Sequence, residues 1–159
     1  RVHCQNLLNE TADTLRPLAA QKGLALTLDL PETPIVIASD RRALTQIVIN
    51  LVNNAIKFTE QGSIKVSLSQ RTADGGSLTE IAVEDTGSGI RPEDQAKLFQ
   101  AFSQLDSTST RNVEGAGLGL YLCQNLANLL GGTLALTSEF GRGTTFTLTI
   151  PTREFRSAA

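Results

Sequence analysis

The sequence predicts an α/β fold, a two-layer sandwich in which a mixed, mostly antiparallel sheet of about five strands carries three or more helices on one face. Apolar residues recur at helical spacing in several segments, and apolar and polar residues alternate in the segments between them. Gly, Pro and Asp gather at the junctions. Strands that occur mostly as antiparallel neighbours, separated by three or four helices, are typical of this architecture.

A helix and two short strands come first. Apolar residues keep a helical period across residues 2–21, and Gly23 follows as a stop signal. Leucines then alternate with polar residues over 24–30, as in a half-buried strand, and 35–38 form a second short strand.

The next predicted helix is capped by Ser39 or Asp40 and ends near Thr59. Its apolar stripe consists of Leu44, Val48, Leu51 and Ala55. This stripe should face the core, which leaves the other side of the helix for chemistry.

Three polar residues share that other side: Asn50, Asn54 and Lys57. Two amide oxygens and an ammonium are groups that suit a magnesium triphosphate. Asn is a poor interior helix former, so Asn50, Asn53 and Asn54 together cost on the order of 2 kcal/mol unless they are used. A solvated helix face is the alternative interpretation.

A hairpin follows. Its first strand has an inward row of Ile64, Val66 and Leu68. The tip is Asp74, Gly75 and Gly76, and the second strand covers 79–85.

Asp85 shares the inward face of that second strand with Ile81 and Val83. A carboxylate without a partner there is costly, so it needs a donor, and the exocyclic amine of adenine is one. Gly87 and Gly89 leave room for a flat group beside the backbone. The alternative is that Asp85 caps the following turn.

A short helix should start at Pro92 and end near Phe99, and a polar stretch follows over 103–112. Phe99 and Phe102 flank the start of this stretch, and we expect them to pack in the core.

Closely spaced glycines, Gly115, Gly117 and Gly119, stand at the start of a predicted helix over 118–130. Free N–H groups and the positive dipole end make such a place an anion site, so phosphates are expected there. Arg111 could close over them. A loop that needs positive φ and a solvated arginine are the alternatives.

The glycine pair 131–132 ends this helix before two closing strands, 133–138 and 144–150. Residues two apart in a strand share a face, so Thr144 should face inward with the apolar residues of its strand. Its hydroxyl should then lie beside Asp85.

Composition limits the function classes. The 159 residues suffice for one domain, and a net charge of −2 with a pI of about 5.4 argues against nucleic acid or an anionic membrane as a partner. Cys4 and Cys123 lack metal-ligand spacing and should be reduced thiols, as in the cytoplasm. No signal peptide or apolar run of about 18 residues occurs. We expect an excised fragment, because the chain begins inside a predicted helix without a Met.

The ordered segments resemble the catalytic, ATP-binding domain of sensor histidine kinases, in the GHKL superfamily that also holds gyrase-type topoisomerases, heat-shock chaperone ATPases and mismatch-repair ATPases. The resemblance covers residues 2–151 and rests on NLVNNAIKFTEQG (N box), LFQAFSQ (F box) and three glycine boxes, DTGSGI, GAGLGL and GRGTTF. The run QIVINLVNNAIKFT is especially similar to hybrid sensor kinases. The resemblance implies a Bergerat-type ATP-binding fold with ATP and Mg²⁺ as cofactors.

The resemblance also implies roles for individual residues. Asn54 would ligate Mg²⁺ with Asn50 beside it, and Asp85 would bind the adenine amine. Catalytic roles would fall to Asn50, Lys57 and Arg111. The nucleotide site as a whole would comprise Asn50, Asn54, Lys57, Asp85, Gly87, Gly89, Ile90, Arg111, Gly115, Ala116, Gly117, Leu118, Gly119, Leu120 and Thr144. Glu114 and Ala116 depart from the family pattern, which often supplies a hydroxyl there.

In this interpretation the single domain 1–159 has a helix leading in from a missing acceptor hairpin (1–22), an ATP lid (99–116) and a C-terminal tail (152–159). The hydrolysing branches place a Glu where this chain has Asn50, and an amide cannot accept a proton from water, so phosphotransfer fits better. The acceptor histidine would lie on a separate dimerisation domain, since His3 does not match the acceptor context.

The partners implied are that acceptor domain and a receiver domain or response regulator, with no nucleic acid and no direct membrane contact. The fragment would be a monomer and its parent a homodimer, possibly an inner-membrane sensor. The alternatives are a GHKL-type ATPase module, a pseudokinase or scaffold, and a protein-serine kinase of the same superfamily.

Overall fold

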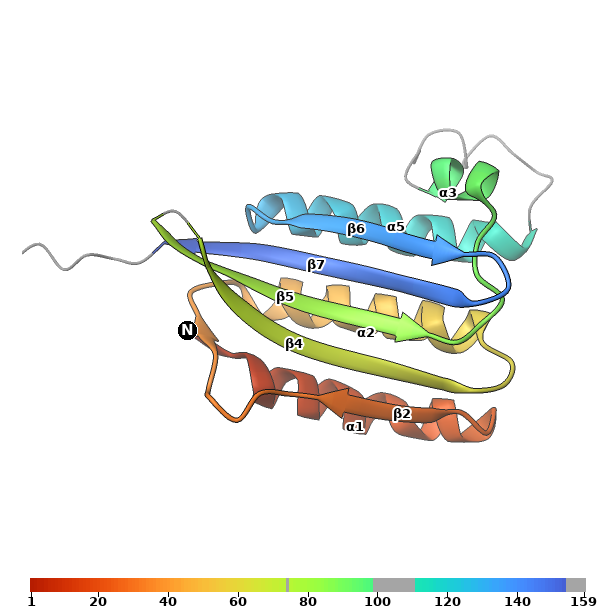
Figure 1. Ribbon diagram of the computed structural model, residues 1–159, viewed down its shortest axis with the longest axis horizontal. Coiled ribbons are helices and arrows are strands. Elements are labelled where there is room, and N and C mark those ends of the chain that lie inside the picture. Colours follow the sequence, from red (N-terminus) through yellow and green to blue (C-terminus); the bar gives the residue numbers. More distant parts are fainter. Residues whose placement is uncertain (74, 99–110, 154–159) are drawn as a thin grey trace, which may run out of the picture.

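A five-stranded sheet covered by helices on one face forms the protein, as Figure 1 shows for the computed structural model, which describes residues 1–73, 75–98 and 111–153. The helices are α1 (Cys4–Gln21), α2 (Arg41–Phe58), α3 (Pro92–Leu98) and α5 (Arg111–Leu129). The strands are β1 (Val2–His3), β2 (Ala25–Asp29), β3 (Val36–Ile37), β4 (Ser63–Ala73), β5 (Gly76–Asp85), β6 (Thr133–Glu139) and β7 (Gly143–Arg153). The sheet order is β2-β4-β5-β7-β6, and β2 with β4 is its parallel pair. The predicted fold class is confirmed.

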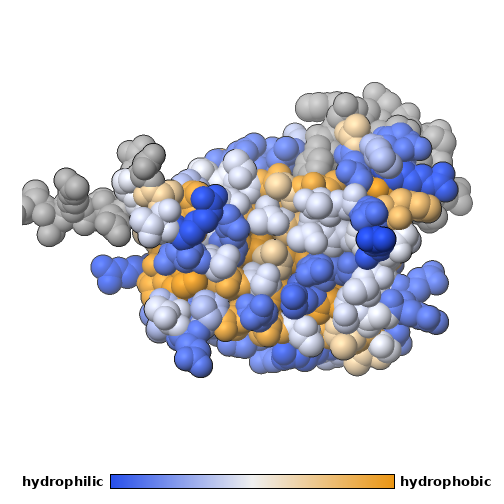
Figure 2. Space-filling model, viewed as in Figure 1, coloured by the Kyte–Doolittle hydropathy of each residue, from blue (hydrophilic) through white to orange (hydrophobic). Residues whose placement is uncertain are grey.

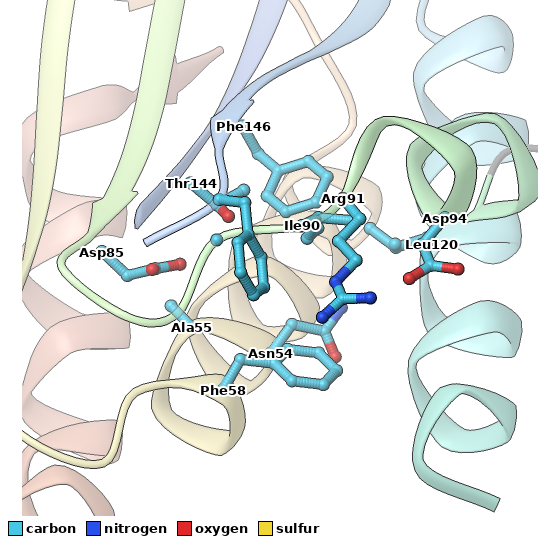
Figure 3. Close-up of a pocket in the computed structure, with 12 residues that line it drawn as sticks. Asn54, Ala55, Phe58, Asp85, Ile90, Arg91, Asp94, Leu120, Thr144 and Phe146 are labelled. Atoms are coloured by element: carbon cyan, nitrogen blue, oxygen red, sulfur yellow. The ribbon is translucent and has the colours of Figure 1, made fainter. Parts of the chain in front are cut away.

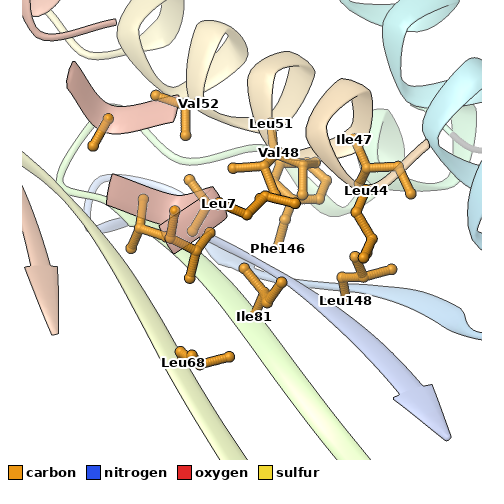
Figure 4. Close-up of a cluster of buried hydrophobic side chains, with 14 of the residues drawn as sticks. Leu7, Leu44, Ile47, Val48, Leu51, Val52, Leu68, Ile81, Phe146 and Leu148 are labelled. Carbon is orange, nitrogen blue, oxygen red and sulfur yellow. The ribbon is translucent and has the colours of Figure 1, made fainter. Parts of the chain in front are cut away.

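The core lies between this sheet and the helices, with α2 at its centre (Figure 4). The predicted stripe of α2 is buried: Leu44, Val48, Leu51 and Ala55 are 4% exposed or less. Ile64, Ile81 and Leu148 face the helices from the sheet and are 2% exposed or less. Burial of one such side chain contributes roughly 1.5–3 kcal/mol, so the position of α2 against the sheet is strongly fixed.

Both ends of α2 are held by side chains. The Asp40 carboxylate Oδ1 accepts from the N–H groups of Arg42 at 2.9 Å and Ala43 at 3.2 Å, so Asp40 is the N-cap. At the other end the Lys22 ammonium donates to the carbonyls of Ile56 at 2.6 Å and Lys57 at 3.3 Å. A cation at the last carbonyls of a helix is favourable, and it fixes the turn that carries Lys57.

None of the described helices covers the outer face of the sheet, and Figure 2 shows hydrophilic, intermediate and hydrophobic residues intermixed over it. Cross-strand ion pairs lie along its strands: Lys65 with Glu84 at 3.8 Å and Arg71 with Glu80 at 3.2 Å. An antiparallel sheet with one solvated face has this alternation of apolar and polar residues.

The predicted strand faces are confirmed. Asp85 pairs with Ile64 on β4 and with Thr144 on β7, which places the carboxylate and the Thr144 hydroxyl at one end of the sheet. The hairpin of β4 and β5 is present, and Asp74 at its tip lies outside the described residues. Both cysteines are free thiols, as expected, and both are buried.

Two helix starts differ from the sequence prediction. The first helix was predicted to begin at residue 2, but α1 begins at Cys4. Val2 and His3 instead pair with β3 in a small antiparallel sheet. The start of α5 is Arg111 rather than 118, so the three glycines at 115, 117 and 119 lie inside the helix. An α-helix leaves only its first four N–H groups without an intrahelical partner, so in this conformation these glycines are not the free donors that were expected.

The expected lid and polar stretch are described only from residue 111 onward, and Phe99 and Phe102 lie outside the described residues. The part of the tail beyond residue 153 also lies outside them. In the described part of the chain, no helix combines the length and apolar character that crossing a membrane requires.

Candidate functional site

A cavity of about 180 Å³ opens where α2, α5, the start of β7 and the loop after β5 meet (Figure 3). Its lining residues are Asn54, Ala55, Phe58, Asp85, Gly89, Ile90, Arg91, Asp94, Leu120, Phe140, Thr144 and Phe146. Six of these, Asn54, Asp85, Gly89, Ile90, Leu120 and Thr144, are residues that the sequence predicted for a nucleotide site. Segments far apart in the chain therefore converge on one concave surface.

Asp85 is the buried acid of this cavity. It is 7% exposed, and its Oδ1 accepts from the Gly87 N–H at 2.9 Å. Burial raises the pKa of the Asp85 carboxyl, whereas hydrogen bonds from the backbone of Gly87 and Thr144 lower it and the nearby Glu84 carboxylate raises it. The bond to Gly87 is the turn cap considered as an alternative, and it coexists with a place on the cavity wall. Asp85 can thus hold the turn and accept a further donor.

Gly87 and Gly89 are required by close backbone contacts. A Cβ on Gly89, whose φ is +71°, would lie 2.2 Å from the Glu139 carbonyl oxygen. A Cβ on Gly87 would lie 2.6 Å from the Phe58 carbonyl oxygen. The Cβ side of Gly89 therefore faces the turn between β6 and β7, while Gly89 still lines the cavity. Room for a flat group beside the backbone stays a prediction.

The turn between β6 and β7 is docked on the loop after β5 by hydrogen bonds. The Gly141 N–H donates to the Ser88 carbonyl at 2.7 Å, and the Ile90 N–H donates to the Ser138 hydroxyl at 2.7 Å. The Gln95 amide of α3 donates to the carbonyls of Ile90 at 2.7 Å and Ser138 at 3.2 Å. This network fixes one wall of the cavity.

Asn54 provides a polar group on the opposite wall. Its side chain is 9% exposed, and its amide Nδ2 has no hydrogen-bond partner among the described residues. A buried polar atom without a partner is costly in a native structure, and an acceptor oxygen of a bound ligand, such as a phosphate oxygen, is one way to satisfy this NH₂ donor. Asn54 is therefore suited to hold a group that enters this cavity.

Asn50 and Lys57 share α2 with Asn54 but do not line the cavity. The Asn50 Oδ1 accepts from the Gln46 amide at 3.1 Å, and Asn50 also lies beside the Cys123 thiol, whose pKa burial raises to about 11. Lys57 is exposed and lines a neighbouring polar recess of about 520 Å³ together with Gly87. On α2, Asn50 lies about one turn before Asn54 and Lys57 about one turn after it.

From α5 the described contributors are Leu120 and Gly119. Leu120 is 2% exposed and lines the cavity, and a Cβ on Gly119 would lie 3.9 Å from the Asn54 Nδ2. The predicted residues Arg111, Gly115, Ala116, Gly117 and Leu118 belong to α5, but their side-chain surroundings lie outside the described part of the structure.

Several lining residues were not predicted: Ala55, Phe58, Arg91, Asp94, Phe140 and Phe146. Phe58 stands four residues after Asn54 on α2, a spacing that puts both on one helix face and could have identified it. Phe146 stands two residues after Thr144 on β7, so strand parity puts both on the inward face. Arg91 and Phe140 meet only because two loops dock, and no local spacing indicates that.

Comparison with known proteins shows what the chain is similar to. Residues 39–154 match the family described as histidine kinase-, DNA gyrase B-, and HSP90-like ATPase. The chain is 44% identical over 137 residues to the autoinducer 2 sensor kinase/phosphatase LuxQ of Vibrio cholerae, covering 86% of this chain and 16% of LuxQ. It is 40% identical over 144 residues to the signal transduction histidine-protein kinase BarA of Escherichia coli, covering 89% of this chain and 16% of BarA. The chain thus spans 16% of the length of these curated relatives.

Solved structures show the same likeness. Full-length ShkA in complex with AMPPNP has a TM-score of 0.80 at 33% identity, covering 96% of this chain and 30% of that one. The catalytic domain of histidine kinase ThkA in a nucleotide-free form has a TM-score of 0.78 at 24% identity, covering 95% of this chain and 93% of that one. The second likeness concerns the fold alone.

Proposed function

The chain belongs to the family of histidine kinase-, DNA gyrase B- and HSP90-like ATPases, and on that premise we propose that it is the ATP-binding catalytic domain of a sensor histidine kinase. One observation carries the proposal: a buried carboxylate, Asp85, and a buried carboxamide, Asn54, lie on one cavity with otherwise largely apolar walls. The relatives named as a sensor kinase and a histidine-protein kinase support the same assignment.

The adenine base would occupy the end of the cavity beside Asp85. The carboxylate offers an acceptor for the exocyclic amine, and apolar side chains such as Ile90, Leu120 and Phe146 supply flat contact area. The buried Thr144 hydroxyl, 5% exposed, stands opposite Asp85 in the strand register and offers a second polar group. A purine with an amine at this edge fits these groups better than one with a carbonyl.

The residues present also fit a magnesium ion. Mg²⁺ takes oxygen ligands and keeps several waters, so one or two protein oxygens together with phosphate oxygens suffice. Asn54 would supply an amide oxygen and Asn50 would lie beside the ion, while Lys57 would contact phosphate. When bound, the ion would neutralise charge on the phosphates as the phosphoryl group leaves.

Asn50 favours transfer over hydrolysis. An amide cannot accept a proton from water, and among the described residues the Asn50 side chain is bonded to the Gln46 amide rather than to a carboxylate. Phosphoryl transfer requires positioning and charge stabilisation, with the nucleophile supplied by another segment. We therefore infer that the γ-phosphoryl group passes to a histidine on a separate dimerisation and acceptor domain.

The phosphotransfer test supplies the 159-residue chain with a purified histidine acceptor hairpin from a hybrid sensor kinase and γ-labelled ATP. We expect label on the hairpin that is stable to base and labile to acid, as a phosphohistidine is. Acid-stable label would instead indicate a serine kinase. Steady ATP hydrolysis without transfer would indicate an ATPase module, and nucleotide binding with neither reaction would indicate a pseudokinase.

Asn54→Ala tests the metal assignment by binding rather than by activity. We expect Mg²⁺ to tighten a non-hydrolysable ATP analogue by about tenfold in the unchanged chain and by less than about twofold in the variant, since an oxygen ligand is lost. Calorimetric titrations with and without Mg²⁺ measure this. The matched control is Asn53→Ala, because Asn53 is the exposed neighbour on the same helix. An equal Mg²⁺ effect in both variants would contradict the assignment.

We expect the parent protein to be a homodimer whose catalytic domain works in the cytoplasm with a receiver domain or response regulator. Hybrid relatives support this expectation, such as the hybrid signal transduction histidine kinase B of Dictyostelium discoideum, which is 41% identical over 133 residues and covers 82% of this chain and 7% of that protein.

A further inference from the structure

A single cation stands at the rim of the cavity. Among the described residues that line it, Arg91 alone carries a positive charge. The Arg91 guanidinium Cζ lies 4.7 Å from the centroid of the Phe140 ring, a cation–π contact. Figure 3 shows the Arg91 side chain directed across the opening toward Asn54 and Phe58.

No described residue forms an ion pair with Arg91. This includes Asp94, which lines the same cavity. A cation–π contact orients a guanidinium without cancelling its charge. An unpaired cation at the mouth of a partly apolar cavity attracts an anionic group of whatever enters.

Phe140 is held in place although it is 57% exposed. Its turn is anchored by the hydrogen bond from the Gly141 N–H to the Ser88 carbonyl at 2.7 Å and by the close contact of Gly89 with the Glu139 backbone. An aromatic ring left this exposed contributes little to the core. The anchored turn therefore holds the Phe140 ring against the Arg91 guanidinium.

Figure 3 shows the Arg91 guanidinium directed at Asn54, whereas Asp85 lies at the other side of the view, so Arg91 belongs to the Asn54 end of the cavity. Asp85 marks the end assigned to the base, and Asn54 marks the end assigned to the metal and phosphates. Resting on the proposed function, we propose that Arg91 is a further nucleotide-binding residue that contacts the phosphates. Phe140 is the positioning residue that keeps the guanidinium over the opening.

Arg91→Gln tests the contact by titration of adenosine, AMP and ADP at one fixed ionic strength. We expect the variant to bind ADP and AMP about tenfold more weakly, because a charge-assisted hydrogen bond to phosphate is lost. Adenosine affinity should stay within about twofold, since it has no phosphate. The matched control is Arg142→Gln, because Arg142 lies in the same turn and pairs with Glu139 at 3.7 Å. It should leave all three affinities unchanged.

Phe140→Leu tests the positioning role. The substitution keeps an apolar side chain and removes the ring, so ADP affinity should fall about threefold in the unchanged chain and not at all in the Arg91→Gln background. Additive losses would mean that Phe140 acts independently of Arg91. Thermal unfolding of each variant without nucleotide should match the unchanged chain, since all three side chains are exposed.

The other outcomes overturn the inference in separable ways. Equal losses for adenosine and ADP would mean that Arg91 shapes the base site. Tighter adenosine binding with unchanged ADP would mean that it blocks the opening. If the unchanged chain binds ADP and Arg91→Gln binds it equally well, this inference alone is wrong. If the unchanged chain binds none of the three ligands, the proposed function is wrong and the inference falls with it.

Discussion

Asp85→Asn should lower the affinity for ADP by about 100-fold. A hydrogen bond to a charged group contributes roughly 1.5–3 kcal/mol, and each 1.4 kcal/mol is about tenfold in affinity. The carboxylate has two acceptor oxygens, one for the Gly87 N–H and one for the adenine amine, whereas the amide of the variant has only one. If the amide oxygen accepts from one of these donors, the amide NH₂ faces the other donor, which is unfavourable. Calorimetric titration of ADP measures the loss.

The control for this substitution is Glu84→Gln. Glu84 precedes Asp85 on β5, points to the solvated face and pairs with Lys65 there, so its neutralisation changes charge without touching the cavity. ADP affinity should stay unchanged. A loss in Glu84→Gln as large as that in Asp85→Asn would mean that net charge, rather than the hydrogen bond, governs binding.

The same Asp85→Asn substitution should leave the nucleotide-free fold at least as stable at neutral pH. Burial raises the pKa of the Asp85 carboxyl above its ordinary value of 3.8, so the folded state binds a proton at Asp85 more readily than the unfolded state does. The stabilisation from this group is fully present below that ordinary value and is lost as the pH rises through the folded-state pKa. Urea unfolding at several pH values should show the variant gaining stability relative to the unchanged chain across that window. A relative loss would show that the backbone bonds to the carboxylate outweigh its burial.

Local periodicity accounts for what the sequence predicted. The stripe and cap of α2 depend on residues within a few turns of one another, so the polar face that carries Asn54 followed from spacing alone, whereas the burial of Asn54 did not. Strand parity placed Asp85 and Thr144 on the inward face, and the β5–β7 register then paired them. These parts of the site needed no knowledge of how distant segments dock.

The remaining features depend on packing between loops, which spacing does not encode. Arg91 and Phe140 meet because the turn after β6 docks on the loop after β5, and both residues are exposed, so hydropathy gives no signal. The start of α5 was misplaced for a different reason. Glycine costs about 1 kcal/mol in a helix interior, so three glycines predict a loop, yet the helix runs through them.

Gly143→Ala is expected to destabilise the protein by about 2–6 kcal/mol, because strain in an unfavourable backbone conformation costs about 1–3 kcal/mol and overpacking a similar amount. Gly143 opens β7 with a φ of +122°, and a Cβ there would lie 2.1 Å from the Asp85 carbonyl oxygen and 3.2 Å from the Thr86 Cα. Backbone atoms cannot rotate away as a side chain does, so the two strand ends would have to separate. Urea unfolding measures the loss of stability.

Gly141→Ala separates strain from close approach. Gly141 lies in the same turn with a φ of +90°, but a Cβ there would meet no atom within 4 Å, so only the strain of about 1–3 kcal/mol applies. The difference in the loss of stability between the two variants therefore measures the cost of the clash between a side chain at position 143 and the backbone at the end of β5. Since that contact sits beside the pair of Asp85 and Thr144, Gly143→Ala should also weaken ADP binding, whereas Gly141→Ala should weaken it much less. Equal losses of stability in the two variants would mean that the close approach of β7 to Asp85 does not fix the carboxylate at the cavity.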